Sequence, residues 1–169
     1  MQYPSLVSRY AIRAVKLSAL MLSVALISPA QAQQKQVDKP VLTLEQARTI
    51  VAAAQEEARK NNWPGAIAVV DDGGWPILSE RMDNAATTLG VQLATEKART
   101  AALFKRPSAD LENAINGGRA AAITAGLVMM EGGLPIIVGG QVIGAIGVSV
   151  DTKVHDSQIA RAGAAAFKP

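Results

Sequence analysis

The 169-residue sequence contains no cysteine and a single histidine. Without cysteine the chain forms no disulfide and offers no thiolate for a zinc site, an iron–sulfur site or nucleophilic catalysis. A Ser-His-Asp triad would have to use His155, and the nearby serines, Ser149 and Ser157, do not lie in a nucleophile-elbow pattern. The sequence therefore offers little support for catalysis based on cysteine or histidine.

The chain also lacks net charge once its first 32 residues are set aside. The whole sequence carries +3 at pH 7, with 17 basic and 14 acidic residues. Three basic residues, Arg9, Arg13 and Lys16, lie within residues 1–32, which contain no acidic residue, so 14 basic residues remain to balance the 14 acidic ones. A neutral chain lacks the electrostatic footprint of a phosphate-binding protein, and we expect no nucleic-acid partner.

The first 32 residues are organised as a signal peptide. A basic stretch precedes the mostly apolar run Leu17–Ser28, and Ala30 and Ala32 occupy the small-residue positions that a signal peptidase reads. The apolar run is shorter than the roughly 20 residues that a membrane-spanning helix needs. We expect cleavage before Gln33 and a periplasmic or secreted protein with no stable membrane span after cleavage; an uncleaved anchor is the alternative.

The remaining sequence predicts one domain after a short connecting segment. Residues 33–42 are mostly polar, contain Pro40, and are typical of a flexible lead-in. The domain is expected over residues 43–167. A chain of this size can bury about two-thirds of its unfolded surface, which is enough to fold without disulfides.

The first half of the domain has the pattern of a helix, a hairpin and a second helix. Thr43 and Gln46 match a capping box, and apolar residues recur after them at helical spacing. Two short apolar runs, 66–71 and 77–82, flank an Asp-Gly turn and predict a β-hairpin. An alanine-rich helix is expected over 88–105.

The second half has helical segments, a second hairpin and a closing helix. A helical stretch is expected from Ser108, with a break at two glycines. The runs 134–138 and 141–150 flank Gly139-Gly140 and predict the hairpin, and the last helix is expected over 156–167. Because hairpins pair antiparallel, the order predicts an α+β fold in which helices flank an antiparallel sheet.

The last strand is expected to present different side chains on its two faces. Its even-numbered residues, from Val142 to Val150, should face one way, and Ile143, Ala145, Gly147 and Ser149 the other. Glycines inside a strand allow a helix backbone or a flat ligand to approach unusually closely.

A haem site is one chemistry that the remaining residues could support. Haem needs an iron ligand, an apolar slot and cations for its propionates. Tyr3 and Tyr10 lie in the export signal, so the candidate ligands in the mature chain are His155, Met82, Met129 and Met130. An exposed histidine at a helix start is the more common explanation of His155, but there the helix dipole disfavours the protonated ring, so His155 could also bind a metal.

Several sequence motifs resemble those of the GlcG/HbpS family of haem-binding or haem-degrading domains. In the first half they are Val69–Gly74 (VVDDGG), Arg81–Asp83 (RMD) and Glu96–Ala101 (EKARTA). In the second half they are Gly132–Pro135 (GGLP) and Gly144–Ser149 (GAIGVS), followed by Asp156, Ala160 and Gly163 in the last helix. The resemblance extends in order from about residue 43 to residue 167.

The resemblance implies a five-stranded antiparallel sheet flanked by helices, a homo-oligomer, and haem or a similar planar ligand as partner and cofactor. The family often has histidine after the two glycines, where this chain has tryptophan, so His155 becomes the candidate metal ligand. A shallow pocket is expected between the last hairpin and the helix 88–105, beside a cationic rim. The expected cofactor-binding residues are Trp75, Lys97, Arg99, Thr100, Phe104, Arg106 and His155.

The sequence therefore favours an exported haem-binding protein that captures, buffers or senses haem. Two other functions remain open at this point. One is a non-catalytic, homo-oligomeric accessory protein. The other is a small-molecule enzyme related to glycolate or corrinoid metabolism, for which His155 or an acidic residue would have to supply the acid–base group.

Overall fold

A capping box begins the first helix of the domain. In the computed structural model, which describes residues 39–169, the Thr43 hydroxyl accepts the backbone N–H of Gln46, and the Gln46 side chain accepts the N–H of Thr43. Helix α2 (Leu44–Lys60) follows, as the sequence predicts. The predicted signal peptide and the first six residues of the lead-in lie outside the described residues, and the last lead-in residue, Leu42, is buried in the core.

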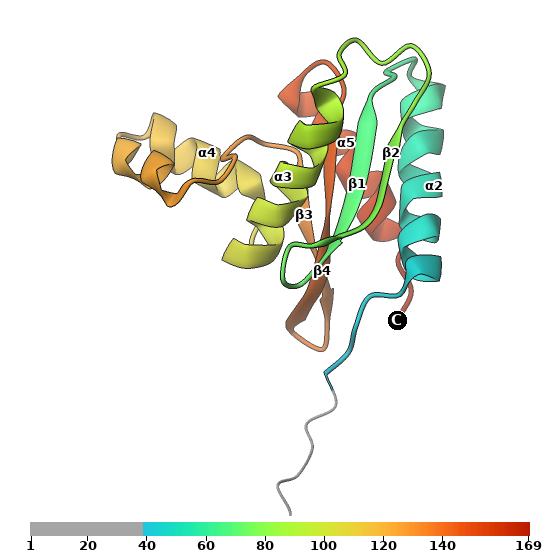
Figure 1. Ribbon diagram of the computed structural model, residues 1–169, viewed down its shortest axis with the longest axis horizontal. Coiled ribbons are helices and arrows are strands. Elements are labelled where there is room, and N and C mark those ends of the chain that lie inside the picture. The colour runs from blue at the N-terminus through green and yellow to red at the C-terminus, as the bar shows by residue number, and fades with distance from the viewer. Residues whose placement is uncertain (1–38) are drawn as a thin grey trace, which may run out of the picture. The chain divides into compact units, whose positions relative to one another are not determined.

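Two hairpins form one antiparallel sheet (Figure 1). Strands β1 (Ala66–Asp71) and β2 (Pro76–Arg81) form the first hairpin, and β3 (Gly133–Val138) and β4 (Gln141–Ser149) form the second. The strand order is β2-β1-β4-β3, so the pairing of β1 with β4 joins the two hairpins. The expectation of five strands is wrong, because the two hairpins supply four and the chain between them is helical over the described residues.

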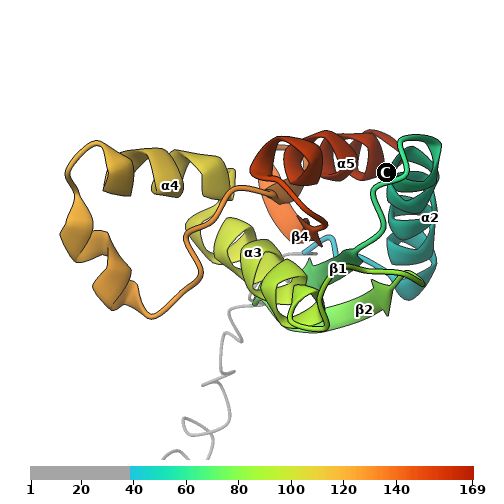
Figure 2. The same cartoon turned by 90° about the horizontal axis from the view of Figure 1, so that it is seen from above.

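The helices cover both faces of the sheet. Helix α3 (Gly90–Phe104) lies on one face, and α2 and α5 (Lys153–Ala165) lie side by side on the other (Figure 2). Helix α4 (Ser108–Asn116) and the 3-10 helix η1 (Ala120–Ala125) extend away from these layers. No helix within residues 39–169 has the length and apolar character needed to cross a bilayer.

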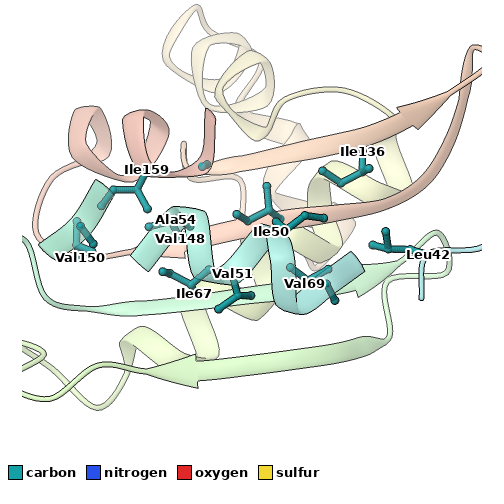
Figure 3. Close-up of a cluster of buried hydrophobic side chains, with 14 of the residues drawn as sticks. Leu42, Ile50, Val51, Ala54, Ile67, Val69, Ile136, Val148, Val150 and Ile159 are labelled. Atoms are coloured by element: carbon teal, nitrogen blue, oxygen red, sulfur yellow. The ribbon is translucent and has the colours of Figure 1, made fainter. Parts of the chain in front are cut away.

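The main hydrophobic core lies between the sheet and the α2–α5 layer. Figure 3 shows side chains from α2, such as Ile50, and from α5, such as Ile159, directed toward the strands. On the other face, α3 contacts the sheet through small residues. A Cβ added to Gly147 would lie 2.5 Å from the backbone nitrogen of Ala98, so the glycine is needed for this close contact. The α3 backbone, rather than a flat ligand, therefore occupies the space that this glycine leaves.

A β-bulge changes the predicted alternation of the last strand. Ile136 pairs with Gly144 and Ile137 pairs with Val142, which leaves Ile143 without a direct partner in β3. Ile143 therefore joins the same core cluster as Ile146, on the α2–α5 side, and the prediction that it faces the other way is wrong. Beyond the bulge the predicted alternation holds.

Candidate functional site

A pocket lies where α3 ends and the chain extends into α4 and η1. We call residues 108–130 the arm and this hollow the arm pocket. Its volume is about 240 Å³, and its lining is mostly apolar, with two guanidinium groups. The lining residues that matter for its chemistry are Phe104, Arg106, Leu111, Arg119, Ala122 and Met129.

The end of α3 places two of the predicted site residues in this pocket. Lys105 adopts a left-handed conformation (φ 56°), which ends the helix, and the backbone N–H groups of Lys105 and Arg106 both bond to the Ala101 carbonyl. The guanidinium carbon of Arg106 then lies 5.8 Å from the centroid of the Phe104 ring, a cation–π contact. The pocket therefore begins with an aromatic ring beside a positive charge.

Neither guanidinium of the pocket is neutralised by a carboxylate. The salt bridges within residues 39–169 involve Lys39, Lys97, Lys153 and His155, but neither Arg106 nor Arg119. An apolar hollow with two unpaired cations suits an apolar ligand that carries carboxylates.

A network of polar contacts fixes the base of the arm. The Ser108 hydroxyl accepts the N–H of Gly133 at 2.8 Å, and Glu112 accepts the N–H of Glu131 at 2.6 Å. Lys153, from the first turn of α5, donates to Glu112 at 2.9 Å. Partial burial raises the pKa of the Glu112 carboxyl, but the Glu131 N–H and the Lys153 charge outweigh it, so the pKa lies below its ordinary value. Both ends of the arm are thus held against the domain.

Trp75 and Arg99 lie together, but outside the arm pocket. The guanidinium of Arg99 is 5.3 Å from the centroid of the Trp75 ring and donates to the carbonyl of Gly74 at 3.3 Å. The Asp71 side chain accepts the N–H of Trp75 and fixes the turn between β1 and β2. Trp75 is 66% exposed, so this pair forms a surface contact rather than a wall of a pocket.

Lys97 does not belong to an exposed cationic rim, which corrects that expectation. Its side chain is 2% exposed, and its ammonium group donates to Asp156 at 2.6 Å and to the carbonyl of Val148 at 3.2 Å. Asp156 also accepts the N–H of Val150. Burial raises the pKa of the Asp156 carboxyl above its ordinary value, while the hydrogen bond and charge of Lys97 act in the opposite direction. The ion pair joins α3 to α5 and is not available to a ligand.

Two glycines at the start of β3, Gly132 and Gly133, make room for Lys97 and Asp156. A Cβ on Gly132 would lie 3.2 Å from the Lys97 side chain and 2.9 Å from that of Asp156, and a Cβ on Gly133 would overlap the Lys97 carbonyl group. Thr100 is also fully buried and donates to the Val128 carbonyl at 2.8 Å, so it holds the last part of the arm rather than a ligand.

His155 does not line the arm pocket. Its ring stacks on Trp63 with centroids 3.6 Å apart, and its Nδ1 lies 2.7 Å from the Asp151 carboxylate. This histidine follows Ser149, which pairs with Ala66, whereas Trp75 follows the other end of β1, about 17 Å away along the strand. Within residues 39–169 no group of three or more histidine, aspartate and glutamate side chains is placed to hold a metal ion.

Other parts of the site are harder to predict from sequence. Of the side chains able to ligate haem iron, Met129 lines the arm pocket and is 7% exposed. Leu111, in α4, and Arg119, between α4 and η1, were not predicted, because their places in the pocket depend on the arm's contacts. A larger hollow of about 430 Å³, between α2 and the C-terminal residues, contains none of the predicted site residues.

Comparisons with known proteins agree with this fold. The family model described as "Haem degrading protein HbpS-like" matches residues 42–165. Protein GlcG of Escherichia coli (strain K12) is 49% identical over 112 residues, which cover 66% of this chain and 83% of that protein. The chain belongs to the HbpS-like family.

Two solved structures have the same fold. A double mutant of HbpS from Streptomyces reticuli aligns with a TM-score of 0.73 and 30% identity, covering 80% of this chain and 93% of that one. A complex of PduOC with heme aligns with a TM-score of 0.69 and 26% identity, covering 76% and 96%. The fold of this chain is therefore one on which a haem complex is known.

The residues of the arm pocket fit part of what haem requires. Phe104 and Leu111 supply apolar surface, Arg106 and Arg119 supply cations for two propionates, and Met129 supplies a thioether. The volume, about 240 Å³, is below the roughly 300–1,000 Å³ of pockets that bury a drug-sized ligand. A porphyrin would therefore remain partly exposed unless the arm moved.

Proposed function

We propose that this protein is an exported haem-binding protein that captures, buffers or senses haem through the arm pocket. The observation that carries the proposal is the combination in one hollow of the Phe104–Arg106 pair, an apolar lining and the buried thioether of Met129. Membership of the HbpS-like family and the likeness to the PduOC:heme complex support the choice of haem among planar carboxylates.

Each pocket residue has a distinct part in this proposal. Phe104 offers an aromatic surface for packing against a porphyrin edge, and Arg106 pairs with a propionate. Met129 is the side chain in the pocket with an atom that binds haem iron, although a thioether alone is a weak ligand. Lys97 and Thr100 act indirectly, because they hold α3 and the end of the arm in place.

The proposal is tested by titrating the purified mature protein with hemin and recording its visible absorption. We expect a saturable, red-shifted Soret band at micromolar protein, about tenfold weaker binding for Arg106→Gln, and a changed band for Met129→Leu. Arg161→Gln is the matched control, because Arg161 is an exposed arginine of α5 outside the pocket. Absence of a saturable band in the wild-type protein would contradict the proposal.

Export is part of the same proposal and rests on the first 32 residues of the sequence. The basic stretch, the short apolar run and the alanines at positions 30 and 32 support cleavage before Gln33. N-terminal sequencing of protein isolated from the periplasm or medium should begin at Gln33. A chain found in the cytoplasm with an intact N-terminus would contradict export without affecting the haem proposal.

A non-catalytic accessory role in a homo-oligomer is a second candidate. The observation that favours it is a group of exposed apolar side chains, Trp75, Leu103 and Phe104, on or beside the second half of α3. Such residues often mark surfaces that bind another protein chain. Light scattering that shows a monomer over a wide concentration range would exclude this candidate.

A further inference from the structure

Within residues 39–169, the outer part of the arm is attached to the domain only through its own two ends. Its residues 117–126 are nearly all exposed, and none of the residues of η1 is buried. The hydrogen bonds of this segment are made within the arm: the N–H of Arg119 donates to Ala114, that of Ala122 to Arg119, and that of Gly126 to Ile123. The segment therefore has little to keep it in a single position.

Glycines in the left-handed region lie at both ends of this segment. Gly118 has φ 103° and Gly126 has φ 69°, and a Cβ on either would meet no atom within 4 Å. The chain is anchored outside both glycines. Before Gly118, Glu112 accepts the N–H of Glu131; after Gly126, the Val128 carbonyl accepts the hydroxyl of Thr100. These positions can absorb a change of backbone angles while the base of the arm stays fixed.

The same segment supplies one of the two cations of the arm pocket. Arg119 lies next to Gly118 and lines the pocket, facing a hollow whose other guanidinium, that of Arg106, belongs to the end of α3. One cation therefore sits on the fixed domain and the other on the loosely held segment. A ligand with two carboxylates on an apolar body would bind both and would hold the segment against the domain.

We propose that residues 118–126 form a cover that closes over the ligand of the arm pocket, and that Arg119 pairs with a second carboxylate of that ligand. The inference rests on the proposed function, since haem is a flat apolar molecule with two propionates. Movement of the cover would also enlarge the arm pocket, whose volume of about 240 Å³ is below that of pockets that bury a drug-sized ligand.

The first test compares hemin with hemin dimethyl ester, which has the same ring and iron but no free carboxylates. Arg119→Gln should weaken hemin binding about tenfold and leave ester binding unchanged, because it removes a charge-assisted hydrogen bond to a carboxylate. Arg161→Gln should change neither, and circular dichroism should show that both variants fold. Equal hemin affinities for the wild type and Arg119→Gln would overturn the assignment of Arg119.

The second test measures the movement of the cover through tryptic cleavage of the bond after Arg119. This bond is exposed in the free protein, and its cleavage, followed by mass spectrometry, should slow at least about fivefold when hemin saturates the pocket. An unchanged cleavage rate with hemin bound would overturn the cover and leave haem binding intact. If the wild-type protein binds no hemin at all, both the proposed function and this inference fail.

Discussion

At the scale of single residues, Lys97 and Asp156 depend on each other. Both side chains are almost completely buried, at 2% and 6% exposure, and both make further hydrogen bonds to backbone groups around β4. A buried charge is costly without its partner, whereas replacement of both charges by neutral groups is often tolerated. The pair is therefore best tested by comparing a single with a double substitution.

Asp156→Asn should lower the free energy of unfolding by about 3 kcal/mol, because it leaves the Lys97 ammonium buried without a counter-charge. The double variant Lys97→Met/Asp156→Asn should recover most of this loss, since the amide oxygen can still accept the Val150 N–H. Urea denaturation of the wild type and the two variants measures the difference. If the double variant were no more stable than Asp156→Asn, the unpaired charge of Lys97 would not be the cause of the lost stability.

The carboxyl of Glu112 should make stability depend on pH. Its pKa is lowered in the folded protein, so its contribution to stability is present above its ordinary pKa of 4.5 and disappears as the pH falls through the lower folded value. Wild type should therefore exceed Glu112→Gln in unfolding free energy at pH 7, and the difference should shrink by pH 3. If the difference in unfolding free energy between the wild type and Glu112→Gln stayed constant from pH 7 to pH 3, the carboxyl of Glu112 would not be the source of the pH dependence.

The residue scale also shows what sequence could not predict. A lysine in an alanine-rich helix is normally exposed, and its partner Asp156 lies 59 residues away, so neither spacing nor composition indicated a buried pair. Arg106 was predicted as a site residue because a cation can pair with a propionate, and Phe104 because an aromatic ring can stack on a porphyrin. Arg119 escaped prediction because its place in the pocket depends on how the arm folds back.

At the scale of elements, strong local signals predicted most of the fold. The capping box at Thr43, the turn glycines and the short apolar runs predicted the first helix and both hairpins. Helix α5 begins earlier than predicted, since Thr152 caps it by accepting the N–H of His155. The bulge at Ile143 and the course of the arm depend on contacts between distant segments and have no local signature.

Gly147→Ala should destabilise the packing of α3 on β4. The added methyl group would meet the Ala98 backbone at 2.5 Å, and neither element can move without disturbing the sheet. We expect a loss of about 1–3 kcal/mol, the usual cost of overpacking. Gly73→Ala is the matched control, because the nearest atoms there, at 3.3 Å, belong to side chains at an exposed turn. Equal unfolding midpoints for the two variants would contradict this account of the interface.

At the scale of the whole molecule, the functional-looking residues form two separate groups. His155, Trp63 and Asp151 gather where β4 ends and α5 begins, whereas the arm pocket lies beyond the end of α3. The sequence grouped His155 with Arg106 because both matched the needs of a haem site. The pairing of β1 with β4 separates His155 from Trp75, and the lining of the arm pocket includes Arg106 but not His155.

This separation predicts that His155→Ala leaves the hemin Soret band and affinity unchanged. The substitution should still alter the fluorescence of Trp63, because the stacked ring is lost. An absorption titration and an emission spectrum of the same sample test both statements. Loss of the hemin band in His155→Ala would place the iron at His155 rather than in the arm pocket.

The most direct measurement of the central claim is the position of bound hemin, observed through the methionine methyl groups. Residues 39–169 contain Met82, Met129 and Met130, and only the last two lie at the arm. In a carbon-13 methyl NMR spectrum, paramagnetic hemin should broaden the Met129 signal most strongly and leave that of Met82 sharp. A spectrum in which saturating hemin broadens Met82 and spares Met129 would contradict binding in the arm pocket.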